Sequence, residues 1–168
     1  MTNTPGAFAA ELENTLYMNL KDGRVVIQML PEVAPRHVDR IKELVRANFY
    51  DGLTFHRVID GFMAQTGDPK GDGTGGSGTK LPAEFSDAPF VRGTLGMARS
   101  QDPNSADSQF FIMFAPAPHL NGQYTVWGNV VDGMEYVDQI KKGNARSNGT
   151  VESPDRIISM ELASDANP

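Results

Sequence analysis

Residues 55–68 read FHRVIDGFMAQTGD, and residues 96–112 read GMARSQDPNSADSQFFI. Both stretches combine strand-forming apolar residues with a few strongly polar ones. In a strand over residues 54–59, alternation places Phe55, Arg57 and Ile59 on one face. If Phe55 and Ile59 point to the core, Arg57 is anchored beside apolar surface. Otherwise Arg57 is an exposed edge-strand residue, or one whose stem covers a hydrophobic patch.

Other side chains in these stretches also fit two interpretations. Phe62 and Met63 are ordinary core residues unless they line a site. Gln65 and Gln109 are ordinary solvated residues unless they hold a partner in place. Residue types and spacing leave these alternatives open.

The sequence on either side predicts a mainly β protein. Residues 16–20 and 25–29 alternate apolar and polar side chains around Asp22 and Gly23, a pair typical of hairpin turns in which both turn residues take a positive φ. Pro35 fits the first turn of a helix, and apolar residues at helical spacing continue to near Asn48. Further strands are expected over residues 54–59, 62–66, 94–98, 110–114, 126–131 and 157–162, and a second short helix over residues 134–141.

This order of elements argues against repeated βαβ units. It predicts a closed antiparallel barrel with helices covering its open ends. We expect one domain over residues 1–168, with its core at about residues 14–163, a loose leader over residues 1–12 and a frayed end over residues 163–168. The long Gly-rich segment over residues 67–90 is expected to be a functional loop.

Composition excludes several classes of function. The 168 residues carry a formal net charge of -6 and no Lys/Arg cluster, which disfavours binding to nucleic acid. The absence of cysteine excludes disulfides, Cys-ligated metals and cysteine nucleophiles. The longest strongly apolar run, residues 110–117, is far shorter than the ~20 residues that span a bilayer. The N-terminal stretch lacks the pattern of a signal peptide, so we expect a cytoplasmic rather than a periplasmic location and no membrane association.

Several motif-like patterns lack the context that their chemistry needs. Residues 71–76, GDGTGG, match a dinucleotide fingerprint, but no helix start follows them. The same loop lacks the alternating acidic ligands and closing glutamate of an EF-hand. The histidines, His37, His56 and His119, do not share an element at metal-ligand spacing. We expect His37 to be solvated on its helix and His56 to be partly buried in a strand, and we predict no metal and no cofactor.

Taken together, the longer motifs resemble the cyclophilins, a family of peptidyl-prolyl cis-trans isomerases, and especially their bacterial members. The resemblance runs over residues 16–162. It is carried by FHRVIDGFMAQTGD (55–68), GTGGSG (73–78), GTLGMA (93–98), SADSQFFI (105–112) and HLNGQYTVWGNVVDGM (119–134). It implies a closed eight-stranded antiparallel barrel capped by two α-helices, with a substrate groove on its outer face. It also implies catalysis of rotation about X-Pro bonds, through non-covalent stabilisation of the twisted amide.

The resemblance assigns roles to individual residues. Arg57 corresponds to the family's catalytic arginine, and Gln65 to the glutamine that orients it and hydrogen-bonds the peptide. Ala98 and Gln109 correspond to the groove wall. The pocket for the substrate's proline ring corresponds to Phe62, Met63, Phe111 and Leu120.

Three groove positions depart from the best-known members. Arg99 stands where many members have an asparagine whose backbone binds the peptide, so a bulkier cation is expected to alter the preference for flanking residues. Tyr124 replaces a histidine and is kept as a groove residue. His119 replaces a tryptophan on which cyclosporin binding partly depends, so we expect that drug to bind only weakly. Trp127 is expected to lie in the core.

The expected partners are proline-containing peptides and unfolded or flexible protein segments, which implies a role in protein folding, and a monomer is expected. Two hypotheses remain: an active isomerase, and a module that holds Pro peptides or acts as a chaperone with incidental isomerase activity. A hydrolase or a metal enzyme is disfavoured because no Ser/His/Asp or ligand-spaced set is present. The joint presence of Arg57, Phe62, Gln65 and Phe111 favours the isomerase.

Overall fold

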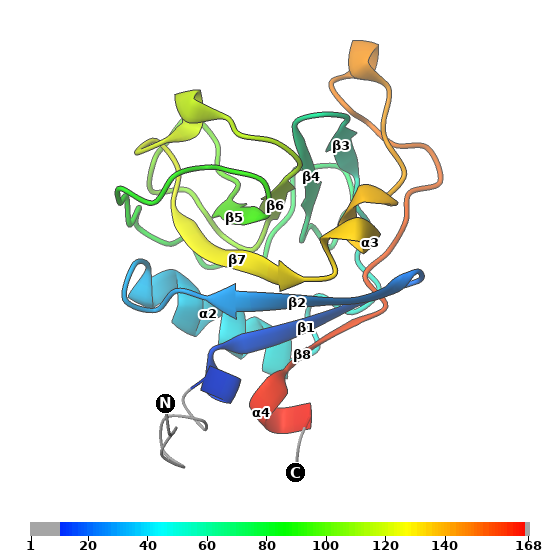
Figure 1. Ribbon diagram of the computed structural model, residues 1–168. Helices are drawn as coiled ribbons and strands as arrows, with labels where there is room; N and C mark the ends of the chain where they lie inside the picture. The colour runs from blue at the N-terminus through cyan, green and yellow to red at the C-terminus, as the bar shows by residue number, and fades with distance from the viewer. Residues whose placement is uncertain (1–10, 167–168) are drawn as a thin grey trace.

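The structure is a computed structural model that describes residues 11–166, and its centre is one antiparallel sheet of eight strands (Figure 1). The strands are β1 (Thr15–Leu20), β2 (Gly23–Met29), β3 (Arg57–Ile59), β4 (Met63–Thr66), β5 (Thr94–Met97), β6 (Phe110–Met113), β7 (Val126–Asp132) and β8 (Ser159–Leu162). The helical elements are α2 (Pro35–Arg46), α3 (Met134–Asp138), α4 (Ala163–Ala166) and the 3₁₀ turns η1 (Pro118–Leu120) and η2 (Ala145–Ser147). The mainly β class with eight antiparallel strands is confirmed, although most elements are shorter than expected.

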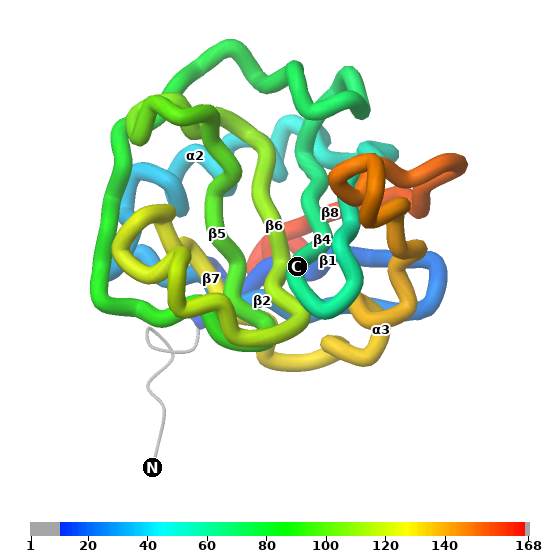
Figure 2. Tube along the Cα trace, turned by 90° about the horizontal axis from the view of Figure 1, so that it is seen from above, coloured from blue at the N-terminus to red at the C-terminus, as the bar shows by residue number. Residues whose placement is uncertain are grey.

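The sheet does not close on itself. Its strand order is β3-β4-β6-β5-β7-β2-β1-β8, and no ladder joins β3 to β8. The prediction of a closed barrel is therefore wrong: the sheet is an open, strongly curled half-barrel (Figure 2). β3 has only three residues, and the chain beside it meets the chain before β8 through isolated bridges, such as Thr54 with Arg156. Pro154 adds to this irregularity because it has no N–H to donate to a ladder.

The β1–β2 hairpin forms as expected, but for a different local reason. Leu20 pairs with Gly23 at its end. The expected pair of positive φ angles is wrong because Asp22 does not have one, whereas Gly23 has a positive φ of 159°, near the edge of extended backbone. Glycine is required by packing instead, since a Cβ on Gly23 would lie 2.5 Å from the ring of Tyr136 on α3. The hairpin end therefore fits closely against that ring.

Helix α2 covers the inner face of the curled sheet. Its apolar stripe, Val38, Ile41, Leu44 and Val45, is buried as expected. His37 is fully buried too, so the expectation of a solvated histidine is wrong. The His37 Nδ1 lies 2.6 Å from the Glu84 carboxylate, yet burial lowers the pKa of His37 more than Glu84 raises it. A neutral ring that donates from Nδ1 fits this site.

Glu84 replaces the missing N-cap of α2. The N-cap residue Ala34 has no side chain that can accept a hydrogen bond. The Glu84 carboxylate instead accepts from the backbone N–H of His37 at 2.9 Å and of Arg36 at 3.3 Å. Two of the N–H groups that a helix start leaves unsatisfied thus bond to a residue of the Gly-rich segment.

We predict that Glu84→Ala lowers the free energy of unfolding by about 2 kcal/mol, because it removes this cap and the partner of a buried histidine. Urea denaturation at pH 7 measures the change. Asp87→Ala serves as the control, because Asp87 is exposed on the same segment, and it should change stability by less than about 0.5 kcal/mol. Equal losses in the two variants would contradict the capping role.

Both faces of the sheet are apolar where β6 lies. Phe110 and Ile112 point into the main core under α2, whereas Phe111 and Met113 belong to a second apolar cluster on the outer side. Trp127 is fully buried in the main core, 5.3 Å from the ring of Phe110, which confirms its expected place. The outer cluster is the floor of the site described below.

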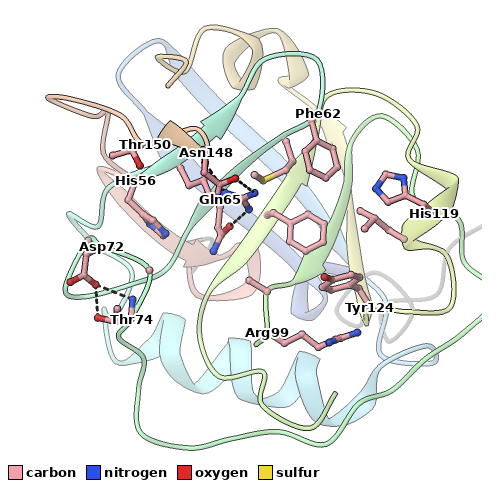
Figure 3. A pocket seen from close by; sticks show the side chains of 17 residues that line it. His56, Phe62, Gln65, Asp72, Thr74, Arg99, His119, Tyr124, Asn148 and Thr150 are labelled. Carbon is pink, nitrogen blue, oxygen red and sulfur yellow. Dashed lines mark hydrogen bonds between the residues drawn. The ribbon is translucent and has the colours of Figure 1, made fainter. Parts of the chain in front are cut away.

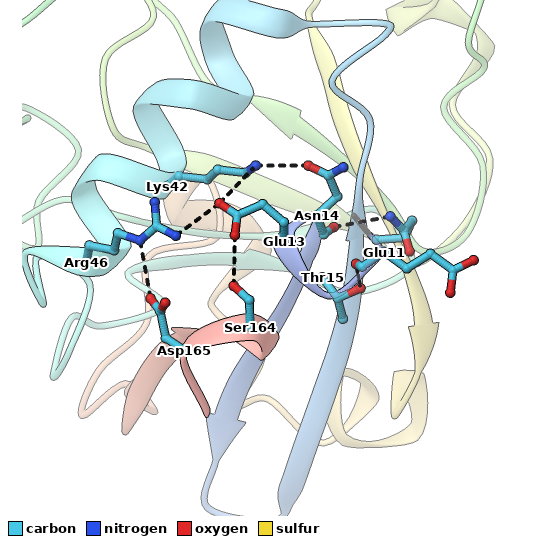
Figure 4. A network of polar contacts seen from close by, with 9 residues as sticks. Glu11, Glu13, Asn14, Thr15, Lys42, Arg46, Ser164 and Asp165 are labelled. Atoms are coloured by element: carbon cyan, nitrogen blue, oxygen red, sulfur yellow. Dashed lines mark hydrogen bonds and ion pairs between the residues drawn. The ribbon is translucent and has the colours of Figure 1, made fainter. Parts of the chain in front are cut away.

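Polar contacts hold residues 163–166, so the expectation of a frayed end is wrong for them, and residues 167–168 lie outside the described residues. Residues 163–166 form α4, and Asp165 accepts from Arg46 at 3.2 Å (Figure 4). Ser164 donates to Glu13 at 3.0 Å, and Glu13 also accepts from Arg46. Of the expected leader over residues 1–12, residues 1–10 lie outside the described residues and residues 11 and 12 are helical. Over residues 11–166, no helix has the length and apolarity to cross a bilayer.

Candidate active site

A groove of about 770 Å³ crosses the outer side of the sheet over β3, β4 and β6 (Figure 3). It has an apolar end beside η1 and a polar end beside β3. The residues expected from the sequence that line it are Arg57, Phe62, Met63, Gln65, Ala98, Arg99, Phe111, His119, Leu120 and Tyr124. Gln109 lines an adjoining hollow of about 320 Å³ instead.

The apolar end is built from packed aromatic rings. Phe111 is 5% exposed and stacks on Phe90, with ring centroids 5.7 Å apart. The Phe111 ring also makes an edge-on contact with the Tyr124 ring, with the two centroids 5.9 Å apart. The rings lie against β5 only because residue 96 is glycine: a Cβ there would lie 2.6 Å from Phe90 and 2.7 Å from Phe111. This end of the groove therefore presents a closely packed apolar surface.

The polar end is dominated by Arg57. It pairs with Gln65 across β3 and β4, so both side chains leave the sheet on the same face. The Arg57 Nη1 donates to Gln65 Oε1 at 3.0 Å, Nε donates to the carbonyl of Asn148 at 3.0 Å, and Nη2 donates to Asn148 Oδ1 at 3.1 Å. Burial lowers the pKa of Arg57, but a guanidinium keeps its charge at any physiological pH. The groove thus holds a partly desolvated, permanent cation.

A chain of amides fixes the direction of the Gln65 side chain. Gln109 Nε2 donates to the carbonyls of Gly73 and Gly75, at 3.0 and 2.9 Å. Those partners only accept, so Gln109 Oε1 must face Gln65, whose Nε2 donates to it at 2.9 Å. Gln65 Oε1 is then left to accept from Arg57, which only donates. Gln109 therefore links the Gly-rich loop to Gln65, and through Gln65 to Arg57.

The Gly-rich loop folds around a buried carboxylate. Asp68 is 1% exposed and accepts from the backbone N–H groups of Lys70 at 2.8 Å, Asp72 at 3.1 Å and Gly73 at 2.6 Å. A Cβ on Gly75 would lie 2.1 Å from Asp68 Oδ1, so the loop needs glycine there. Its N–H groups point at an internal carboxylate and not at a nucleotide phosphate. Within residues 11–166, no three His, Asp or Glu side chains are grouped so that they could hold a metal ion.

Asp68 predicts a loss of stability in acid. Burial raises the pKa of Asp68, but the backbone N–H donors lower it by more, so the folded value lies below the ordinary one. The resulting stabilisation is complete above about pH 4 and is lost as the pH falls through the folded pKa. Asp68→Asn should cost about 2 kcal/mol at pH 7 and reduce the acid dependence below pH 4. Urea unfolding from pH 3 to pH 7 tests this, and an unchanged acid slope in the variant would contradict it.

The departures from the family pattern lie on one side of the groove. The Arg99 guanidinium stacks over the Tyr124 ring, with Cζ 4.4 Å from the ring centroid, and donates to the carbonyl of Gln123 at 2.7 Å. Its side chain is therefore held against the wall. His119 is exposed, and its ring lies 6.0 Å from that of Phe62. These contacts keep all three side chains at the rim of the apolar end.

The sequence did not single out every residue that lines the groove. His56 is 7% exposed and lies just before β3, so the expectation that it is partly buried in a strand is wrong. Burial lowers the pKa of His56, which favours a neutral ring beside Arg57. Asn148 and Thr150 come from the loop after α3. Asn148 lies in an Asn-Gly-Thr sequence that resembles only a glycosylation signal, so its contact with Arg57 had no local signal.

Residues 15–162 match the family model described as "Cyclophilin type peptidyl-prolyl cis-trans isomerase/CLD". The chain belongs to the cyclophilin family of peptidyl-prolyl cis-trans isomerases. A relative from Brucella suis, named a probable peptidyl-prolyl cis-trans isomerase, is 58% identical over 171 residues, covering 95% of this chain and 87% of the relative. Peptidyl-prolyl cis-trans isomerase B of Bacillus subtilis is 42% identical over 141 residues, covering 82% of this chain and 98% of the relative.

Solved cyclophilin structures share the fold. A cyclophilin from Hirschia baltica superposes with a TM-score of 0.83 at 26% identity, covering 100% of this chain and 84% of the other. A Cryptosporidium parvum cyclophilin, solved in the presence of the dipeptide Ala-Pro, superposes with a TM-score of 0.80 at 27% identity, covering 88% and 98% of the two chains. The family and the isomerase activity expected from the sequence are therefore confirmed.

Proposed function

We propose that this cyclophilin isomerises X-Pro bonds by donating hydrogen bonds from Arg57 to the twisted amide while the apolar end of the groove holds the proline ring. The observation that carries the proposal is the partial use of the guanidinium. Three of its five N–H groups bond to Gln65 and Asn148. One N–H on each terminal nitrogen is then left for substrate. These two donors stand beside an apolar pocket.

The chemistry of the peptide bond explains why two donors suffice. Rotation about an amide costs about 18–20 kcal/mol because resonance is lost in the twisted state. The proline nitrogen becomes pyramidal there and regains a lone pair, which a fixed cation can hydrogen-bond. That bond is weak in the planar ground state and strong in the transition state, which is the condition for catalysis. No covalent step and no proton transfer are needed.

The apolar end of the groove holds the proline ring in place during the rotation. Phe111, Met63 and Leu120 are each less than 10% exposed, so their positions are fixed by packing. A proline ring seated on them stays still while the preceding carbonyl swings. Water is also displaced from around the Arg57 donors, which strengthens their hydrogen bonds.

Proline-containing peptides and flexible protein segments are the substrates that fit an open groove on the outer face. The Cryptosporidium parvum cyclophilin was solved in the presence of the dipeptide Ala-Pro, which supports this class of ligand. The exposed imidazole of His119 offers less apolar surface than an indole, so we expect cyclosporin to bind weakly. A cytoplasmic location and a monomeric state stay predictions from the sequence.

Exchange spectroscopy by NMR on a short Ala-Pro peptide tests the proposal. At one enzyme per hundred peptides, the cis and trans signals should exchange far faster than the spontaneous rate of tens of seconds or more. Shifted peptide signals without faster exchange would mean that the groove only holds Pro peptides, and the catalytic role of Arg57 would be rejected.

A further inference from the structure

We infer that Asn148 is a positioning residue for Arg57, holding the guanidinium so that its free donors face the substrate. The inference rests on the proposed role of Arg57. Gln65 reaches only one terminal nitrogen of the guanidinium, Nη1. Asn148 supplies the two acceptors on the rest of the group, its backbone carbonyl for Nε and its side-chain oxygen for Nη2.

The geometry of these two hydrogen bonds lets Asn148 fix the orientation of the Arg57 guanidinium. Nε and Nη2 carry parallel N–H bonds along one edge of the planar guanidinium, and a pair of acceptors on that edge fixes the plane as well as the position. Without the acceptor for Nη2, only the Nε and Nη1 hydrogen bonds would remain, and the plane of the guanidinium would be held less firmly. Figure 3 shows Asn148 and Gln65 close together at the polar end of the groove.

The loop that carries Asn148 is itself fixed to β3. The backbone N–H of Val58 donates to the carbonyl of Gly149 at 2.8 Å, and that of Gly143 donates to the carbonyl of Val58 at 2.8 Å. A Cβ on Gly143 would lie 1.9 Å from the Gly149 carbonyl oxygen, and a Cβ on Gly149 would lie 2.6 Å from a side-chain carbon of Ile59. These hydrogen bonds and the close packing at Gly143 and Gly149 therefore fix the position of the loop against β3.

Asparagine at position 148 suits both the backbone conformation of the loop and the need for a side-chain acceptor. Asn148 has a φ of 56°, in the left-handed region that asparagine adopts far more readily than most side chains. Its side-chain oxygen then turns back toward Nη2, although the residue as a whole is exposed. Glycine would accept this backbone but lacks the second acceptor, and aspartate would accept it and keep that acceptor. These two substitutions separate the backbone from the side chain.

The test compares kcat, KM and melting temperature for variants of the whole chain on an Ala-Pro peptide. Asn148→Gly should lower kcat about fivefold, the effect of losing one net hydrogen bond, with KM and melting temperature nearly unchanged. Asn148→Asp should stay within about twofold of the parent rate. Ser147→Gly is the matched control, since Ser147 is the exposed neighbour of Asn148 in the same loop, and it should leave kcat unchanged.

A double variant makes the inference specific. If Asn148 acts through Arg57, Asn148→Gly should have no further effect in an Arg57→Ala background. A parent-like kcat for Asn148→Gly, or an equal loss in both backgrounds, would overturn the inference. If Asn148→Gly lowers the melting temperature, Asn148→Ser replaces it, because the shorter side chain cannot reach Nη2. A normal rate in Arg57→Ala alone would instead reject the proposed function.

Discussion

Arg57→Ala is expected to lower kcat/KM for X-Pro isomerisation by about 10²–10³-fold, the loss typical of removing a donor aimed at transition-state charge. The reason is that the donors left free by Gln65 and Asn148 disappear together, whereas the apolar end remains. The measurement is the isomerisation rate of an Ala-Pro peptide over a range of enzyme concentrations. A rate within about twofold of the parent would contradict the assigned mechanism.

The fold should tolerate this change. Arg57 is only partly buried, and the acceptors it leaves on Gln65 and Asn148 can bond to water instead. The melting temperature should therefore stay close to that of the parent. Arg57→Lys is the informative control: it keeps the charge, but an ammonium cannot replace the planar group that bonds to Gln65 and both acceptors of Asn148. Its rate should fall between those of the parent and the alanine variant.

Phe111→Ala should weaken peptide binding about tenfold or more and also destabilise the protein by about 3 kcal/mol or more. Phe111 is the floor of the apolar end, so its loss removes the surface on which a proline ring rests. It also removes the partner on which Phe90 stacks. Titration of an Ala-Pro peptide followed by NMR gives the affinity, and urea denaturation gives the stability.

Met113→Ala separates these two effects. Met113 lies two residues along β6 in the same outer cluster and is fully buried, but it does not line the groove. It should lose about 2–5 kcal/mol of stability while the peptide affinity stays unchanged. If Met113→Ala and Phe111→Ala weakened binding equally, the apolar end would not be the ring pocket.

Patterns within one element could be predicted from the sequence. The helical spacing of Val38, Ile41, Leu44 and Val45 identified α2, and alternation identified β1 and β2. The groove lining followed from motifs, since Arg57 and Gln65 stand in one long motif and Phe111 in another. The structure brings these residues to one groove, while their catalytic roles stay predictions.

Features that depend on distant segments could not be predicted. The openness of the sheet arises because no ladder joins its two edge strands, β3 and β8, and no local pattern encodes this. The cap of α2 comes from Glu84, 47 residues beyond His37. The acceptors of Asn148 lie 91 residues from Arg57 in the chain. Tertiary contacts determine these partners, and a single sequence shows only that each residue is polar.

The central claim is that Arg57 stabilises the twisted amide more than the bound planar peptide. The most direct measurement is the rate of cis–trans exchange of an Ala-Pro peptide fully bound to the enzyme, obtained by NMR line shapes at saturating enzyme, together with its Kd. The account predicts that Arg57→Ala slows exchange on the enzyme at least about 100-fold while Kd changes by less than about threefold. An on-enzyme rate equal to that of the parent, with the whole loss appearing in Kd, would show that Arg57 only binds the peptide and would contradict the account.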